Sequence, residues 1–197
     1  GATWVTMCFF LHQWLFSDNF NALIGSYKEV LVDDRCSKDA LFGVFDYNLK
    51  TLPKWMLPKR FNYDKHRTGM KLVNPENNNL IKGDTMNPQF GRGSRKTVIF
   101  MDEGAHWEYF QDAWASSGDT TNCRLTASTP FGQNAFYYLK ESGVDAFKMH
   151  WKSHPLKDQK WYEFEKTRRT DEEVAQEIDI SYTRSQKGRY YPEWENV

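Results

Sequence analysis

Apolar residues occupy nearly every side of the first helical pattern in the chain. Residues 4–16 are apolar around most of the circumference, which is typical of a helix that packs against neighbours on several sides. Residues 20–27, FNALIGSY, have the composition of a strand. A second helical pattern follows over residues 28–49, and Pro53 and Pro58 close it.

Shorter elements are predicted in the middle of the chain. In residues 70–85, MKLVNPENNNLIKGDT, two brief apolar runs flank a segment with turn chemistry, which predicts a hairpin. Residues 97–101, TVIFM, and 123–130, CRLTASTP, predict two more strands, with a helix near residues 109–116 between them.

The last third of the chain has mixed patterns. Residues 134–143, NAFYYLKESG, predict a helix with Gly143 just past its end. Residues 146–151, AFKMHW, predict a strand, and residues 158–180 are helical by composition, with an acidic first turn at residues 171–173.

These elements place the chain in the α/β class. Strands alternate with helices, and near-continuous apolar strands are typical of a mainly parallel sheet with helices on both faces. A length of 197 residues favours one domain. We therefore expect a doubly wound α/β domain whose ligand crevice lies at the carboxyl ends of the strands.

Composition excludes several classes of protein. No apolar run approaches the ~18–20 residues of a membrane span, so we expect a soluble chain without a membrane partner. Three widely spaced cysteines without a CxxC pair suggest neither disulfides nor a zinc ribbon, and they favour a reducing compartment.

The net charge of zero conceals a basic region. Residues 51–100 hold ten Lys and Arg against three Asp and Glu, whereas residues 101–150 hold three against seven. Clustered basic side chains attract phosphate polymers, although a solvated face also accounts for such a run.

Two adjacent carboxylates, Asp102 and Glu103, directly follow the apolar run at residues 98–101. At the carboxyl end of a strand both side chains can approach one ligand. Such a pair suits a magnesium nucleotide: Asp102 would hold Mg²⁺, and Glu103 would deprotonate the water that attacks the γ-phosphate. The alternative is a solvated acidic pair at a helix N-terminus.

The first three residues, Gly1, Ala2 and Thr3, precede the apolar helix directly. Phosphate-binding loops end in Gly, Lys and a hydroxyl residue and continue into a buried helix. Gly1 and Thr3 fit this pattern, whereas Ala2 stands where the Lys is expected. Because the chain opens on this pattern without a leader, we expect a missing segment upstream of Gly1.

The strand at residues 123–130 leads into hydroxyl side chains. Ser128 and Thr129 stand where a γ-phosphate could be sensed, and an ordinary hydroxyl-rich turn is the alternative. His106 lies close to the acidic pair, where it either contacts a ligand or has a core or surface role. Other conspicuous side chains are interpreted as packing anchors: Trp151, Trp161 and Trp194.

Together these segments resemble the ATPase domain of the large terminase subunit of tailed bacteriophages. The resemblance rests on GATW before the helix, VIFMDEGAHW as a Walker B segment and TASTPFGQNAFYY as the coupling motif after it. It extends through MHWKSHPLKDQKWYEFE to EEVAQEIDISYTRSQKGRYYPEW, and so covers most of the chain.

The resemblance implies a P-loop NTPase fold of the additional catalytic glutamate class, with ATP and Mg²⁺ as ligands. Gly1 to Thr3 would form the end of the phosphate loop, with Thr3 and Asp102 at the metal and Glu103 as the catalytic base. Ser128 to Pro130 would couple hydrolysis to motion. It also implies an ATPase domain over residues 1–180 and a linker over residues 181–197 toward an absent nuclease domain.

Terminases often carry a trans-acting arginine just before the Walker B strand. In GRGSRK the first candidate is Arg92 and the second is Arg95, because a guanidinium neutralises charge that develops on the γ-phosphate. Further implied partners are double-stranded DNA, a portal protein, the small terminase subunit and a homo-oligomeric ring. The implied location is the cytoplasm of a bacterial host.

The expected function is an ATP-hydrolysing motor that packages viral DNA into a procapsid. Two alternatives stay open: a helicase-like nucleic-acid translocase, and a non-hydrolysing scaffold that binds DNA or capsid proteins. Ala2, and the absence of the loop residues upstream of it, further imply that this fragment alone holds the fold without hydrolysing ATP.

Overall fold

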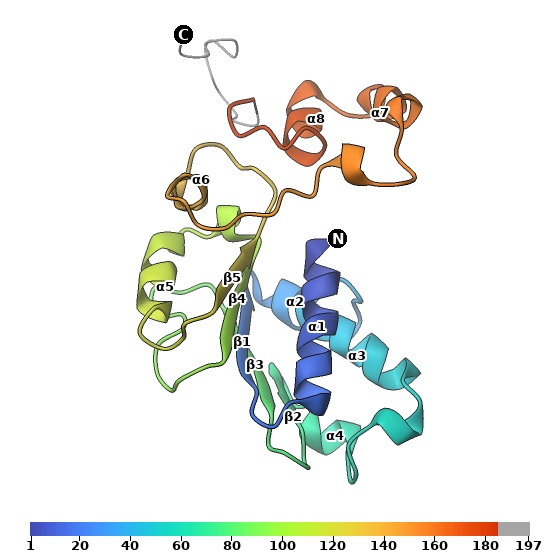
Figure 1. The fold of residues 1–197 in the computed structure, drawn as a ribbon, viewed down its shortest axis with the longest axis vertical. Helices are drawn as coiled ribbons and strands as arrows, with labels where there is room; N and C mark the ends of the chain where they lie inside the picture. The colour runs from blue at the N-terminus through green and yellow to red at the C-terminus, as the bar shows by residue number, and fades with distance from the viewer. Residues whose placement is uncertain (185–197) are drawn as a thin grey trace. The chain divides into compact units, whose positions relative to one another are not determined.

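A five-stranded sheet organises the first part of the molecule (Figure 1). The computed structural model describes residues 1–184, and the chain divides into two compact units, Gly1–Ala127 and Ser128–Val197. Each unit is described by itself. The expected linker is therefore outside the described residues from position 185 onward, as is Trp194.

The sheet is mainly parallel, as the sequence predicts. The strand order is β2-β3-β1-β4-β5, and β1 pairs in parallel with β3 and β4, as β4 does with β5. Only β2 runs antiparallel, against β3. The strands are β1 (Asn21–Ser26), β2 (Lys71–Val73), β3 (Leu80–Thr85), β4 (Val98–Asp102) and β5 (Arg124–Ala127).

Helices of this unit lie on both faces of the sheet (Figure 1). On one face are α1 (Ala2–Phe16), α2 (Glu29–Val32) and α3 (Leu41–Thr51), and on the other is α5 (Phe110–Ser117). A short helix, α4 (Tyr63–His66), precedes β2. The α/β fold class expected from the sequence is confirmed.

The larger core lies between the sheet and the helices α1 and α3. Phe10 of α1 packs edge to face against Phe20 and Phe100, with ring centroids 5.7 and 6.2 Å apart. Side chains of alternate strand residues point to opposite faces, so Ala22 and Ile24 join this core. Burying large rings in this way supplies much of the stabilisation of such a domain.

One expectation about α1 is wrong. The helix has a buried side with Phe10 and Trp14, but Val5, Phe9 and Phe16 are 67%, 55% and 56% exposed in the described chain. The helix is therefore apolar on most sides but packs against the rest of the described chain on one side only.

The predicted hairpin is confirmed, and its polar turn has a structural task. Asn79 is 2% exposed and donates from Nδ2 to the carbonyl oxygens of Ser17, at 2.7 Å, and Trp14, at 3.1 Å. Asn74 donates from Nδ2 to Trp14 O at 2.9 Å. The last carbonyls of a helix have no partner within it, so this turn satisfies the end of α1.

The single helix predicted over residues 28–49 is wrong, since α2 and α3 are separate helices. Asp33 ends α2, and its carboxylate accepts hydrogen bonds from Arg67. Arg67 also donates from Nε to Asp46 of α3 at 2.8 Å. In one continuous helix, residues 33–40 could not form the connection between α2 and α3. The ion pairs of Arg67 with Asp33 and Asp46 therefore outweigh the helical pattern of the sequence here.

The second unit contains three α-helices in its described part: α6 (Ala135–Glu141), α7 (Gln159–Lys166) and α8 (Asp171–Glu177). The helix predicted over residues 158–180 is therefore two helices. The break is explained by Thr170, which begins α8 with a capping box shared with Glu173. The acidic first turn of α8 is confirmed.

The strand predicted over residues 146–151 is wrong. Its apolar residues alternate, but Phe147 is 88% and Met149 is 52% exposed, and only Trp151 is buried. Trp151 stacks on Tyr162 at 4.9 Å and joins Val174 and Ile178 in a small core. The interpretation of Trp151 as a packing anchor is confirmed.

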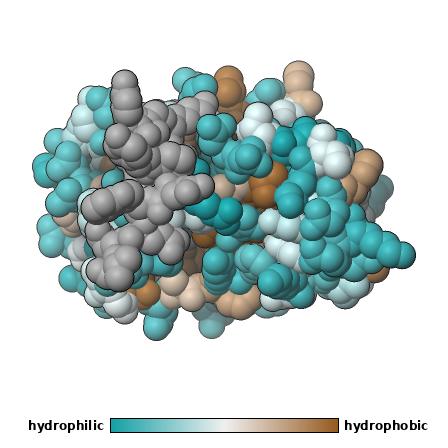
Figure 2. All heavy atoms as spheres, turned by 90° about the horizontal axis from the view of Figure 1, so that it is seen from above, coloured by the Kyte–Doolittle hydropathy of each residue, from teal (hydrophilic) through white to brown (hydrophobic). Residues whose placement is uncertain are grey.

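Exposed apolar side chains are scattered over the surface. In the view of Figure 2 the surface is mostly hydrophilic, with separate hydrophobic patches. Among residues 1–184, none of the helices combines the length and hydropathy that a bilayer crossing requires.

Candidate nucleotide site

Four parallel strands end at the same edge of the sheet. The last residue of β4, Asp102, is in register with Ala127, the last residue of β5. On its other side β4 pairs with β1, where Met101 is in register with Gly25. The carboxyl ends of parallel strands are where ligands bind in open α/β sheets.

The amino end of α1 begins beside this edge. Its N-cap is Gly1, which has no side chain that could cap the helix, and its first turn has no acidic residue. The first N–H groups of a helix lack partners within it and carry the positive end of the helix dipole. This helix end is therefore suited to receive an anion.

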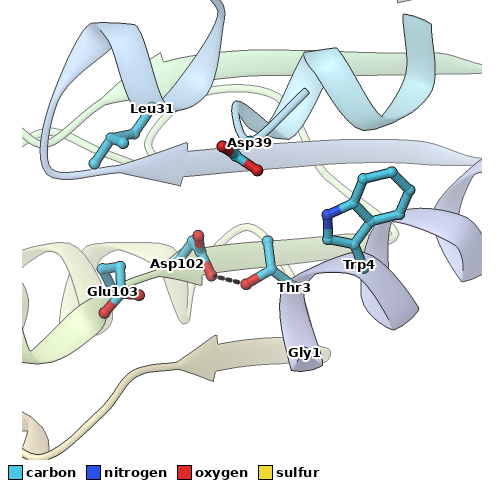
Figure 3. A pocket seen from close by; sticks show the side chains of 7 residues that line it. All are labelled: Gly1, Thr3, Trp4, Leu31, Asp39, Asp102 and Glu103. Carbon is cyan, nitrogen blue, oxygen red and sulfur yellow. Dashed lines mark hydrogen bonds between the residues drawn. The ribbon is translucent and has the colours of Figure 1, made fainter. Parts of the chain in front are cut away.

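Thr3 and Asp102 meet between these two elements. Thr3 Oγ1 donates a hydrogen bond of 2.9 Å to Asp102 Oδ1 (Figure 3). The close-up shows the hydroxyl of the first turn of α1 directed at the carboxylate from the end of β4. The structure thus brings together two residues that the sequence predicts at one site.

Asp102 is a buried carboxyl group, with 9% of the residue exposed. Burial raises the pKa of Asp102 to about 6, and the negative charge of Glu103 adds to this increase. Hydrogen bonds from the Thr3 hydroxyl and the Glu103 backbone oppose it. Burial disfavours the charged form of this carboxyl group, and a cation that binds nearby stabilises that charged form.

Glu103 occupies an unusual backbone conformation. Its φ of 52° and ψ of 43° are left-handed, which costs a non-glycine residue roughly 1–2 kcal/mol. The strain is held by the short 3₁₀ turn Gly104–His106 that follows. Trp107 then donates from Nε1 to Asp102 O at 2.8 Å, which ties the end of this turn to the main chain of Asp102.

A pocket of about 210 Å³ lies at this point. Gly1, Thr3, Asp102 and Glu103 contribute to its lining, as the sequence predicts, and Figure 3 shows them around one space. The described lining does not include Ala2. Three further residues line it that sequence reasoning did not place there: Trp4, Leu31 and Asp39.

Asp39 reaches the pocket because the segment between α2 and α3 is held in place. Arg67, which is fully buried, binds Asp33 at one end of this segment and Asp46 beyond the other. A Cβ at Gly43 would collide with Ser37 O, so the segment packs directly on the α3 backbone. No motif in the sequence marks Asp39; the only signal is an acidic residue just before an apolar helix.

Neither Arg92 nor Arg95 is among the described lining residues of this pocket. Both are exposed in the loop between β3 and β4. Arg95 O accepts a hydrogen bond of 3.2 Å from Asn21 Nδ2, at the amino end of β1 and thus at the opposite edge of the sheet. An arginine that serves a neighbouring subunit need not lie near its own pocket, so this assignment stays a prediction.

Ser128 and Thr129 directly follow Ala127 in the chain and open the second unit. Both are partly buried. Their expected role in sensing a phosphate stays a prediction.

The donor set fits Mg²⁺ in chemistry. Thr3 and Asp102 offer two oxygen ligands side by side, and Mg²⁺ usually takes one or two protein oxygens together with waters and substrate phosphates. Among residues 1–184, no group of three or more His, Cys, Asp or Glu is placed to hold a metal ion.

The fold is similar to solved terminase structures. The large terminase of a thermophilic bacteriophage (crystal form 2) shares 12% sequence identity, with a TM-score of 0.60 over 90% of this chain and 45% of that chain. A structure of that terminase in complex with ADP has 10% sequence identity and a TM-score of 0.60, and the match covers 90% of this chain and 44% of that chain. A third structure, of the same terminase in crystal form 3, has 13% sequence identity and a TM-score of 0.58, and the match covers 90% of this chain and 44% of that chain.

These likenesses concern the fold, since the sequences have diverged widely. No protein-family model matches the chain, and no curated protein matches its sequence. The chain spans less than half the length of the terminase structures that it matches.

Proposed function

We propose that this chain is the ATP-hydrolysing motor domain of a large terminase subunit, which drives double-stranded viral DNA into a procapsid. The hydrogen bond between Thr3 and Asp102 carries the proposal. It joins a helix N-terminus suited to phosphate with an acidic strand end, within a fold shared with large terminases.

In this proposal the phosphates of ATP lie at the N-terminus of α1, where backbone N–H groups from Gly1 onward receive them. Thr3 Oγ1 and Asp102 would hold Mg²⁺, which when bound neutralises charge on the phosphate oxygens. The pocket lining supports the need for a cation: Asp39, Asp102 and Glu103 bring three carboxylates, and no Lys or Arg is among the described lining residues.

Glu103 is the proposed general base. Its carboxylate lines the pocket beside Asp102, where it would accept a proton from the water that attacks the γ-phosphate. Ser128 and Thr129 are the proposed coupling residues after β5. Arg92, or in second place Arg95, is the proposed arginine that reaches the ATP of a neighbouring subunit.

The partners in this proposal follow the terminase assembly: DNA, a portal protein, the small subunit and a ring of identical subunits in the cytoplasm of a bacterial host. The solved phage terminase in complex with ADP supports a nucleotide ligand in this fold. A helicase-like translocase would use the same acidic pair.

One observation favours the non-hydrolysing scaffold as a second candidate. Ala2 stands at the position of the phosphate-loop lysine, and the described lining is acidic. Without a cationic side chain from elsewhere, a triphosphate would meet repulsion in this pocket.

The test is DNA-stimulated ATP turnover of the full-length protein with Glu103→Gln. We expect turnover to fall by about 10²–10⁴-fold, the usual contribution of a general base, while ATP binding is retained. Glu108→Gln is the matched control, because Glu108 is an exposed glutamate of the same segment. Unchanged turnover in Glu103→Gln would exclude the enzyme.

Two further assays separate the candidates. A terminase packages DNA into procapsids, whereas a helicase-like protein unwinds a duplex with the same nucleotide requirement. A wild-type protein that binds DNA and capsid components but never turns over ATP would establish the scaffold.

A further inference from the structure

His106 lies close to the proposed base, Glu103, at the end of the short turn that follows it. The 3₁₀ turn at Gly104–His106 closes with a hydrogen bond of 2.9 Å from His106 N to Glu103 O. The same turn brings His106 Nε2 to 4.0 Å from Glu103 Oε2. This distance is beyond a direct hydrogen bond but short enough for an ion pair or for one bridging water.

The imidazole is held by a second element. It stacks on Tyr27, with centroids 5.3 Å apart and planes 30° from parallel. Tyr27 directly follows β1, and Lys28 Nζ lies 5.3 Å from the centre of its ring. Tyr27 therefore provides a platform that is independent of the turn.

The side chains of His106 and Glu103 are 25% and 37% exposed. At that exposure an unrestrained glutamate samples several rotamers, and an isolated ion pair contributes little stability. The contact is therefore better explained by orientation than by folding energy. The left-handed backbone of Glu103 sets the direction in which its side chain leaves the chain, and His106 lies beside the carboxylate at the other end of that side chain.

The geometry points to His106 as a positioning residue that holds the Glu103 carboxylate in the orientation needed to accept a proton from water, with Tyr27 as its support. This inference rests on the proposed function. His106 is not among the described lining residues of the pocket, so in this inference it acts through Glu103. It further assigns Tyr27, at the end of the neighbouring strand, a part in the site.

The experiment measures kcat and KM for ATP in the full-length protein. For His106→Ala we expect kcat to fall by about 10- to 100-fold, as a misplaced catalytic group causes, with KM changed by no more than about twofold because ground-state binding is untouched. His106→Asn keeps a donor at shorter reach and should recover part of kcat. Tyr27→Leu should lower kcat in the same direction, and Tyr27→Phe, which keeps the ring, should lower it less.

His12→Ala is the matched control. His12 also contacts an aromatic ring, Phe16 at 5.1 Å, but it lies on the exposed side of α1 away from the carboxylates. It should retain wild-type kcat and KM.

Combination with Glu103→Gln separates positioning from a structural role. If His106 acts only through Glu103, the double variant His106→Ala/Glu103→Gln has the kcat of Glu103→Gln alone. A further fall in the double variant, a loss confined to KM, or wild-type kcat in His106→Ala overturns the inference. An inactive Glu103→Gln beside a fully active His106→Ala leaves the proposed function standing, whereas a fully active Glu103→Gln overturns both.

Discussion

Thr3 Oγ1 lies 2.9 Å from Asp102 Oδ1, although 99 positions separate the two residues in the chain. The hydrogen bond fixes the start of α1 against the end of β4. Because both oxygens face the pocket in Figure 3, the contact determines where a cation would be held.

Replacing Thr3 with Val should damage the site, while the backbone hydrogen bonds of α1, which do not involve this hydroxyl, still form. Thr3→Val keeps the shape of the side chain but removes the oxygen, and we expect the Mg²⁺ concentration for half-maximal ATP turnover to rise by about 10- to 100-fold. Thr3→Ser should restore most of the loss. Thr6→Val is the control, since the Thr6 hydroxyl donates to Ala2 O within α1; an equal effect in both variants would contradict a metal role.

Asp102→Asn should change how stability depends on pH in the unliganded protein. The pKa of Asp102 is raised from 3.8 to about 6 on folding, so between these values the folded state keeps a proton that the unfolded state has lost. Its contribution to stability is therefore present below pH 4 and is lost as the pH rises through 6. The loss is about 3 kcal/mol at most.

Unfolding in urea between pH 4 and 8 measures this effect. Relative to wild type, Asp102→Asn should gain stability across the window and show a constant difference above it. Asp112→Asn, at an exposed carboxylate of α5, should show no such trend. If the difference in unfolding free energy between Asp102→Asn and wild type is constant from pH 4 to 7, the pKa of Asp102 is not raised by folding.

Arg67→Met should destabilise the fold more than any surface substitution. The guanidinium is fully buried between Asp33 and Asp46 and lies 4.5 Å from the Phe42 ring centre. Its removal leaves two nearly buried carboxylates unpaired, which costs about 3–5 kcal/mol. Denaturant unfolding measures the change, and Lys71→Met at an exposed position of β2 is the control. Adding Asp33→Asn and Asp46→Asn should recover part of the loss; no recovery would argue against charge as the cause.

Arg92→Ala should leave ATP binding nearly intact and abolish cooperative turnover in the assembled ring, because the guanidinium would act on a neighbouring subunit. Mixed rings of Arg92→Ala and Glu103→Gln subunits should regain partial turnover, since some interfaces then contain both wild-type residues. Full activity of Arg92→Ala alone would move the assignment to Arg95, whose variant is tested in the same way.

The basic region should bind DNA with strong salt dependence. Lys54, Lys59 and Arg60 are exposed around Trp55, which is 82% exposed. If Lys59 and Arg60 each neutralise one phosphate, Lys59→Glu/Arg60→Glu should weaken duplex binding and reduce the slope of log K against log salt by about 2. Lys148→Glu/Lys160→Glu in the second unit is a reversal of equal charge and should keep the parent slope. A slope near zero in the wild type would refute a phosphate-binding face.

Elements made of long apolar runs could be predicted from the sequence. The helix α1 and the strands β1 and β4 follow directly from such runs, and the hairpin follows from its turn residues. The meeting of Thr3 with Asp102 was also predictable, because a helix that leads into a parallel strand begins near the carboxyl ends of the strands.

The predictions that were wrong concern segments whose structure depends on contacts with residues distant in the sequence. The break between α2 and α3 depends on Arg67, and the position of Asp39 at the pocket depends on that break. The alternating residues near Phe147 look like a strand, but no strand pairs with them in the described chain. Local pattern contains no information about such contacts, and neither does it place Tyr27 beneath His106.

The left-handed backbone at Glu103 lowers the stability of the fold at the same position that supplies a carboxylate to the pocket. Glycine adopts this conformation without the strain that a side chain brings, so Glu103→Gly should fold at least as well as the parent chain while lacking the carboxylate. Selection for stability alone would favour glycine here. The glutamate at this position therefore exchanges backbone stability for a carboxylate at the pocket.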